Sequence, residues 1–283
     1  MSVKIIIDSA SDINHDEALQ MGIIMMPMNI TFGEEEYMDG VDLLPRQFYQ
    51  KLHESKVLPK TSLINSFRFE EEFAKHINAG DEVVAITISS KLSGTFNSAV
   101  EASEKFDGKV QVVDSMNAAI GERLLAQYAL ALSKQGKTAK EIASALNESK
   151  SRLQVMAVID TLEYLKKGGR ISGAAAAAGK ILAIKPVVAV VDGEVKMIGK
   201  AMGSKNGYNL LNKIVKDSGG FDTSLPFGAL WSGLDQSISD KYIQDSAALW
   251  GVDKDSVTSY ILGGTIGTHI GPGAVGVAYF KKA

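Results

Sequence analysis

Short apolar segments alternate with helical segments through the first half of this 283-residue chain, and this alternation restricts the fold more than any other feature. Apolar runs that end at a polar residue are typical of strands buried on both faces. Strands separated by helices predict a parallel sheet that helices cover on both sides. The predicted strands span residues 3–8, 82–88 and 110–114, and the predicted helices span residues 45–54, 67–79, 92–105, 117–135 and 137–152.

The second half carries a signal for antiparallel pairing. Asp192-Gly193 lies between β-rich runs at residues 186–191 and 194–198, and Asp-Gly is a strong hairpin turn. With a strand predicted at residues 153–159, this hairpin indicates a mixed sheet. We therefore expect two domains: residues 1–152 with the parallel sheet, and residues 153–283 with the mixed sheet.

The segment at residues 256–280 contains no Asp, Glu, Lys or Arg, and it is long enough to span a bilayer. This segment holds six glycines, five of which lie with Pro272 between two β-branched runs. This pattern favours two buried strands joined by a Gly-rich loop over a membrane helix. No N-terminal apolar stretch is long enough for a signal peptide. We therefore expect a cytoplasmic protein that is not embedded in a membrane.

Composition and motifs exclude several function classes. The chain has no cysteine, which rules out disulfides, a thiol nucleophile and cysteine-ligated metals. A net charge of −3 argues against nucleic acid binding, and the four histidines show no metal-ligand spacing. Residues 173–180 resemble a phosphate-binding P-loop, but the glycines are one residue too far apart and Ile181 replaces the usual Ser or Thr. A nucleotide site on this chain alone is not expected.

A hydroxyl-rich loop at residues 89–95 is the strongest candidate for a ligand site. It follows a predicted parallel strand and precedes a helix, which is where open α/β sheets place ligands. Its four hydroxyls, one glycine and the free N–H groups of a helix start suit a carboxylate or phosphate. The simpler interpretation is helix capping, but capping needs one hydroxyl.

Four other segments carry polar residues whose role the sequence leaves less certain. Asp8 to Asp12 are interpreted as a helix cap, since the acids would repel an anion. Thr61-Ser62 precede a predicted helix and could be a cap or a second hydroxyl donor, of which the sequence favours the cap. Arg170 follows the glycine pair of a helix C-terminus and is either solvated or bound to a carboxylate. His269 precedes a Gly-Pro-Gly turn and is equally compatible with a core position and with a ligand-facing one.

Several of these segments occur together in a characteristic order, and the whole set covers essentially the entire chain. On these segments the protein resembles the DegV family, the fatty-acid-binding subunits of bacterial fatty acid kinase. The segments are DSASD (residues 8–12), MDGVDL (38–43), KTS (60–62), SSKLSGTFNSA (89–99), VVDS (112–115), LEYLKKGGRIS (162–172), IKPVVAVVDGEV (184–195) and HIGPGAVGVAYF (269–280).

The resemblance implies a two-domain DegV-like α/β fold, with a parallel three-layer α/β/α domain and a smaller two-layer α/β domain built on a mixed sheet. One long-chain fatty acid would lie between the domains. Its carboxylate would be bound by Thr61, Ser93, Gly94, Thr95 and His269. Arg170, Asp39 and Ser62 would form the supporting polar network.

The resemblance also implies that this chain is a carrier rather than an enzyme. It would have no catalytic residues, metal or cofactor. A separate kinase subunit, related to dihydroxyacetone kinases, would bring ATP and phosphorylate the bound carboxylate, and the acyl phosphate would enter phospholipid synthesis.

The chain departs from the family pattern in three places. Leu63-Ile64 replace the usual Gln-Pro, Arg123 replaces a usual glycine, and Met202 replaces an Arg that accompanies kinase coupling in the family. We therefore expect lipid binding to persist and kinase coupling to be altered. Two alternatives stay open: an acyl hydrolase with Ser93 as nucleophile and His269 as base, and a carrier of another amphipathic anion.

Overall fold

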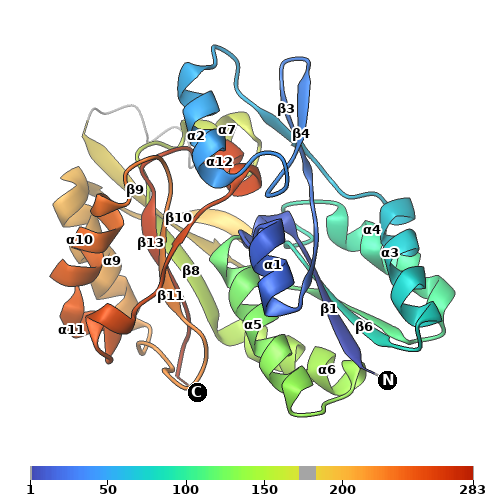
Figure 1. Cartoon of the computed structure of the whole chain (residues 1–283). Helices are drawn as coiled ribbons and strands as arrows, with labels where there is room; N and C mark the ends of the chain where they lie inside the picture. The colour runs from blue at the N-terminus through green and yellow to red at the C-terminus, as the bar shows by residue number, and fades with distance from the viewer. Residues whose placement is uncertain (1, 172–182, 283) are drawn as a thin grey trace.

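A parallel four-stranded sheet forms much of the N-terminal half of the computed structural model, which describes residues 2–171 and 183–282 (Figure 1). The strand order is β2-β1-β6-β7, and all three pairings are parallel. This confirms the parallel sheet that the strand–helix alternation predicts. The strands are β1 (Val3–Asp8), β2 (Ile24–Met26), β6 (Glu82–Thr87) and β7 (Val110–Asp114).

Helices cover both faces of this sheet, because successive residues of each buried strand point to opposite sides. On one face, Val83 and Ala85 of β6 share an apolar core with Phe69 and Phe73. These phenylalanines belong to α3 (Ser66–Asn78), which lies beside α4 (Thr95–Ser103). The opposite face packs against α1 (His15–Met21), α5 (Ile120–Lys134) and α6 (Ala139–Ser149). Thr138 and Glu141 form the predicted capping box of α6.

A six-stranded mixed sheet, in the order β10-β9-β8-β13-β11-β12, forms the second half. Only the β11–β12 pair is parallel. The predicted hairpin is present, with Asp192 and Gly193 at the positive φ values of 53° and 81° that such a turn needs. The strands are β8 (Leu153–Val158), β9 (Ile184–Val191), β10 (Glu194–Met202), β11 (Gly228–Trp231), β12 (Ser259–Ile261) and β13 (Val275–Phe280).

The two faces of the mixed sheet have different partners. Its outer face packs on α9 (Gly203–Asp217), α10 (Ser237–Asp245) and α11 (Ala247–Trp250). Its inner face shares an apolar core with the parallel sheet and α5, in which Val155 and Phe280 join Ile5 and Leu124. The division at residue 152 stays a prediction, since this core runs through both halves.

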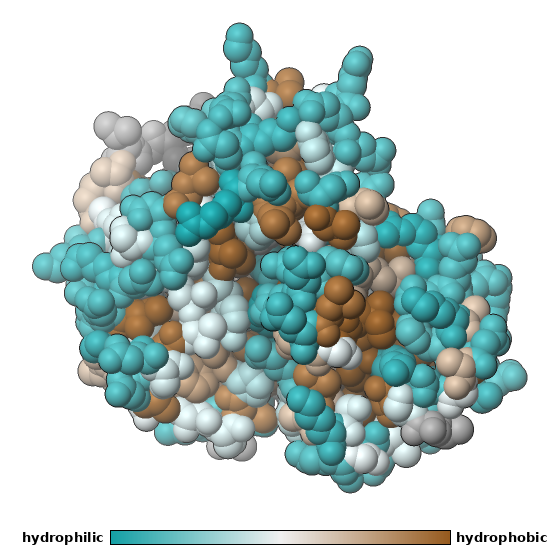
Figure 2. All heavy atoms as spheres, in the orientation of Figure 1, coloured by the Kyte–Doolittle hydropathy of each residue, from teal (hydrophilic) through white to brown (hydrophobic). Residues whose placement is uncertain are grey.

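A three-stranded antiparallel sheet, ordered β4-β3-β5, was not predicted. It comprises β3 (Asn29–Phe32), β4 (Glu35–Met38) and β5 (Lys60–Ser62), and α2 (Pro45–Glu54) packs beside it. Figure 2 shows hydrophilic side chains projecting at the end of the molecule that α2 and the β3–β4 hairpin form. The interpretation of Thr61-Ser62 as a helix cap is wrong, because both lie in β5 and Asn65 caps α3.

Other predicted boundaries also need correction. α4 begins at Thr95 and α5 at Ile120, each three residues later than expected, because irregular loops follow β6 and β7. The glycine-rich segment before β13 contains the helix α12 (Gly264–Ile270), where a loop was expected. A further short helix, α7 (Glu163–Lys167), precedes Gly168, and 3-10 turns span Ser9–Ser11, Glu104–Phe106, Lys150–Arg152 and Lys254–Ser256. The P-loop-like residues 173–180 lie outside the described residues.

Within the described ranges, no helix combines the length and apolar character that crossing a membrane requires.

Candidate functional site

An apolar cavity of about 380 Å³ lies between the parallel and the mixed sheet. Its wall on the mixed sheet is formed by alternate residues of neighbouring strands, because these point to one face. In β8 they are Val155 and Ala157, and in β9 they are Val188 and Val190. The opposite wall includes Ala118 and residues of α12. The cavity therefore suits a long apolar ligand.

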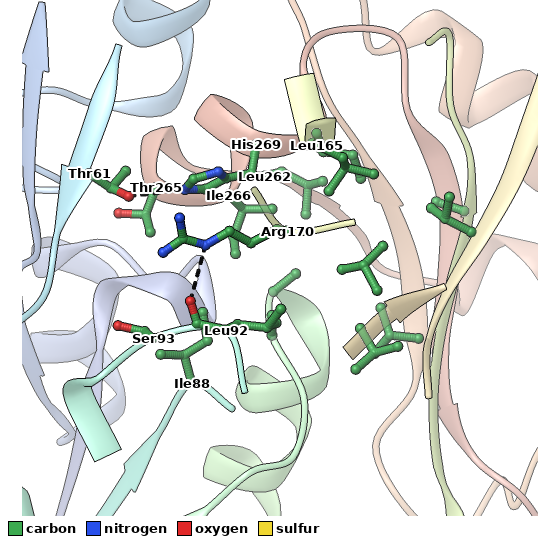
Figure 3. A pocket seen from close by; sticks show the side chains of 18 of the residues that line it. Thr61, Ile88, Leu92, Ser93, Leu165, Arg170, Leu262, Thr265, Ile266 and His269 are labelled. Carbon is green, nitrogen blue, oxygen red and sulfur yellow. Dashed lines mark hydrogen bonds between the residues drawn. The ribbon is translucent and has the colours of Figure 1, made fainter. Parts of the chain in front are cut away.

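Polar groups gather at one end of this cavity, although they come from distant parts of the sequence (Figure 3). β5 contributes Thr61 and Ser62, and α12 contributes Thr265 and His269. The hydroxyl of Thr61 lies 3.0 Å from Nε2 of His269. The remaining members are Ser93 and Gly94 of the loop after β6, and Arg170 after α7. We call these residues the polar end of the cavity.

Arg170 supplies the positive charge of the polar end. Its Nε donates to the carbonyl oxygen of Leu92 (3.1 Å) and its Nη1 to that of Gly168 (2.6 Å). Figure 3 shows the guanidinium between Ser93 on one side and Thr61 and His269 on the other. Among the described residues that line the cavity, Arg170 is the only Lys or Arg, and none is acidic. This end is therefore suited to an anion, and a guanidinium matches a carboxylate well.

The hydroxyl-rich loop divides its predicted ligand groups between two roles. Ser93 and Gly94 line the cavity. Thr95 is buried behind them, with its hydroxyl 2.9 Å from that of Ser93. The Ser89 hydroxyl instead donates to the carbonyl oxygen of Gly193 at 2.8 Å and so joins the loop to the β9–β10 hairpin. A Cβ at position 94 would lie 2.9 Å from the tip of the exposed Leu63 side chain, which would have to shift.

His269 is neutral at physiological pH. Burial, and to a smaller extent the positive charge of Arg170, lower the pKa of His269 from 6.5 to about 4. Its Nδ1 has no hydrogen-bond partner among the described residues, and Gly168 packs directly against the ring. The imidazole is thus a hydrogen-bonding group beside Thr61, and a nearby anion would favour its charged form.

We expect His269 to titrate near pH 4 in the free protein and at a higher pH when a carboxylate occupies the polar end, because an opposite charge stabilises the imidazolium. The unfolded chain binds this proton at a higher pH than the folded protein. Neutral His269 therefore contributes stability above pH 6.5 that is lost as the pH falls toward 4. NMR titration of the His269 ring, assigned with His269→Gln, measures both values. A pKa of His269 near 6.5 in the free protein would contradict the burial of its imidazole.

Asp39 does not line the cavity. It is buried behind α12, where its carboxylate accepts the backbone N–H groups of Gly264 and Thr265, each at 3.0 Å. Asp39 therefore supports the polar end through the helix that carries Thr265 and His269. Sequence reasoning missed Thr265 because the surrounding glycines indicated a loop, whereas a helix places it on the same side as His269, four residues on.

The prediction that Asp8 to Asp12 cap the next helix is wrong for α1, and Asp8 caps only the 3-10 turn at Ser9–Ser11. Asp8 accepts the N–H groups of Ala10 (2.9 Å) and Ile88 (2.8 Å), while Asn14 caps α1. Asp8, Asp12, Asp39 and Glu122 are all buried, which raises the pKa of each, to about 7 for Asp8. Within residues 2–171 and 183–282, no cluster of three or more acidic or histidine side chains is arranged to hold a metal ion.

Comparisons with known proteins agree with this geometry. A family model described as an uncharacterised protein of the DegV family matches residues 2–282. A DegV domain-containing protein from Caldanaerobacter subterraneus is 33% identical over 99% of both chains. A fatty-acid-binding DegV family protein from Thermus thermophilus has a similar structure, with a TM-score of 0.88, 30% identity and coverage of 99% of this chain and 100% of the other. A stearic acid-binding protein from Eubacterium ventriosum gives a TM-score of 0.86 at 26% identity, covering 100% and 99% of the two chains.

Proposed function

Because the chain belongs to the DegV family, we propose that it binds one fatty acid, with the acyl tail in the apolar cavity and the carboxylate at the polar end. The observation that carries this proposal is the cavity itself, which is apolar along its length and has one cationic end. Its volume of about 380 Å³ lies within the range of about 300–1,000 Å³ that is typical of small-molecule pockets. A long acyl chain fits this space.

The cavity can stabilise both the acyl tail and the carboxylate of such a ligand. Burying each CH₂ group contributes about 0.8 kcal/mol. Burying the carboxylate is costly unless hydrogen bonds replace its water. Arg170, the hydroxyls of Thr61 and Ser93, and the imidazole of His269 offer those hydrogen bonds at one end of the cavity.

Mass spectrometry tests the ligand class directly. The purified protein is denatured and its organic extract analysed, with a protein lacking a lipid cavity as the control. We expect fatty acid in an amount close to one per chain. Extraction of another amphipathic anion would favour the alternative that the protein carries that anion and not a fatty acid. An empty extract, together with no calorimetric signal on adding palmitate, would reject the proposal.

The geometry does not favour the alternative of an acyl hydrolase. Such an enzyme needs Ser93 hydrogen-bonded to a base. Here the Ser93 hydroxyl contacts Thr95, and Nε2 of His269 contacts Thr61. Turnover of a chromogenic ester that Ser93→Ala abolishes would revive this alternative.

We further propose that a separate kinase subunit phosphorylates the bound carboxylate. In support, a second cavity of about 350 Å³ shares Thr61, Arg170 and His269 with the polar end. Lys60 and Lys167 also line this cavity, and a basic lining suits an approaching phosphate donor. It offers a route by which a partner enzyme reaches the carboxylate.

Met202 bears on this partnership. It ends β10 and is 59% exposed, so a larger cationic side chain fits there without disturbing the core. We expect Met202→Arg to increase the rate of ATP-dependent acyl phosphate formation with a bacterial fatty acid kinase subunit, since an exposed guanidinium adds a strong anion-binding group. Met202→Gln is the uncharged control. Equal rates for the three proteins would show that this position does not affect coupling.

A further inference from the structure

α12 carries two residues of the polar end, Thr265 and His269, on a sequence that is a poor helix former. It spans seven residues and includes Gly264 and Gly267 together with β-branched Thr and Ile. Isolated helices of this length are not stable in water. Gly263, at its N-cap, has no side chain with which to cap it. The position of α12, and so of His269, must therefore be set by contacts from outside the helix.

Two aspartates of the N-terminal half hold the start of α12. Asp39 accepts the N–H groups of Gly264 and Thr265, as described above. Asp12 accepts the N–H of Gly263 through Oδ1, at 2.6 Å, across 251 positions of the sequence. The two carboxyl groups thus take the first three backbone donors of the segment. Asp12 is the member of this pair that follows the 3-10 turn after β1, in the segment that the sequence analysis interpreted as a helix cap.

Asp12 is itself fixed from several directions. Its backbone has a φ of 59°, and its N–H donates to the carbonyl oxygen of Ser9 at 3.1 Å. Its own carbonyl oxygen accepts Nη2 of Arg123 at 2.5 Å. Arg123 is paired with Glu17 and lies 4.4 Å from the ring centre of Tyr260. Asp12 therefore connects the end of β1 to α12 through a rigid set of contacts.

We propose that Asp12 is a positioning residue for the polar end, acting through α12 to hold Thr265 in place and His269 against Thr61. This inference rests on the proposed function as far as ligand affinity is concerned. Its structural part, the placement of His269, does not depend on any ligand.

The charge around Asp12 makes an uncharged variant informative. Burial has the largest effect and raises the pKa of Asp12, as do the neighbouring Asp39 and Asp8. The hydrogen bond from Gly263 and the charge of Arg123 lower it. The charged and titratable groups that surround it are Asp8, Asp39, Tyr49, Glu122 and Arg123. Its Oδ2 has no partner in the described part of the chain. Asparagine keeps an acceptor oxygen for Gly263 and tolerates positive φ, but cannot ionise.

The test compares Asp12→Asn with Asp12→Gly, which tolerates the same φ but accepts no hydrogen bond. Calorimetry with palmitate is run at mildly acidic and mildly alkaline pH. We expect Asp12→Gly to weaken binding about tenfold, the effect of one lost buried hydrogen bond. Asp12→Asn should bind close to wild type, with an affinity that changes less with pH. In the free proteins, the pKa of His269 should rise from about 4 toward 6.5 in Asp12→Gly and stay low in Asp12→Asn.

Each outcome decides the proposal. If Asp12→Gly leaves both palmitate affinity and the His269 titration unchanged, Asp12 does not position the site. If Asp12→Asn loses affinity as Asp12→Gly does, the hydrogen bond to Gly263 is not the cause. If wild type binds no palmitate, the proposed function fails, while the His269 titration still tests the positioning role. Should Asp12→Gly not fold, Asp12→Ser, whose hydroxyl is one bond shorter than the carboxylate and so does not reach the N–H of Gly263, takes its place and is judged by the same two readouts.

Discussion

Ala157→Phe is expected to lose binding of long-chain fatty acids by roughly a thousandfold while the protein stays folded. Ala157 lies in β8 with its side chain on the cavity face, opposite Val188 of β9. A benzyl group there occupies the space of about five methylenes. At about 0.8 kcal/mol for each CH₂ that no longer fits, the loss is about 4 kcal/mol, or roughly a thousandfold.

The fold should tolerate this substitution although Ala157 is buried. Adding bulk to a closely packed core usually costs stability, but this side chain extends into existing empty space. We therefore expect a melting temperature equal to or above that of wild type, because filling a cavity restores packing contacts. The prediction thus separates loss of ligand from loss of structure.

Calorimetry with a series of saturated fatty acids measures the effect. Ala157→Ser, which keeps the cavity, is the control and should bind as wild type does. Ala157→Phe should still bind acids about five carbons shorter than the preferred ligand, since the polar end is unchanged. Unaltered binding of long chains by Ala157→Phe would show that the tail lies elsewhere.

The parallel sheet was predictable because its strands are long, apolar and separated by helices. The β4-β3-β5 sheet was not, because β4 and β5 are short and carry polar residues such as Glu35 and Lys60. α12 was missed for a different reason. Gly264 and Gly267 indicate a loop, but they allow close packing against α2, where a larger side chain at 267 would collide with Phe48. Tertiary contacts here override local propensity.

The candidate site also combines residues that the sequence predicted with residues that it did not. The loop containing Ser93 was found from its position after a parallel strand, which general rules for α/β sheets make informative. The local sequence around Thr61 indicated a cap, since its contact with His269 joins residues 208 positions apart. No periodic pattern in the sequence indicates that Thr61 and His269 lie together. Only the resemblance to a family placed both at one site. The cavity itself depends on which face of the mixed sheet meets the parallel sheet, which a single sequence does not specify.

Arg170→Met is expected to weaken fatty acid binding by a hundredfold or more and to leave binding of the matching fatty alcohol nearly unchanged. A carboxylate at the polar end would lose its only cationic neighbour among the described lining residues. Removing one partner of a buried ion pair costs about 3–5 kcal/mol, because the remaining charge stays desolvated. An alcohol carries no charge and needs only a hydrogen bond, which Thr61, Ser93 or His269 offers.

Competition between palmitate and hexadecanol, measured on wild type, Arg170→Met and Arg170→Lys, checks this prediction. Lysine retains the charge and should recover part of the affinity, though not the paired geometry of a guanidinium. Arg170 also donates to the carbonyl oxygens of Leu92 and Gly168, so thermal unfolding of each variant is the control for lost structure. The pKa of His269 should rise in Arg170→Met, because the positive charge that lowers it is gone. Equal losses for acid and alcohol would mean that Arg170 shapes the cavity without binding a carboxylate, and the cavity would then select its ligand by apolar shape alone.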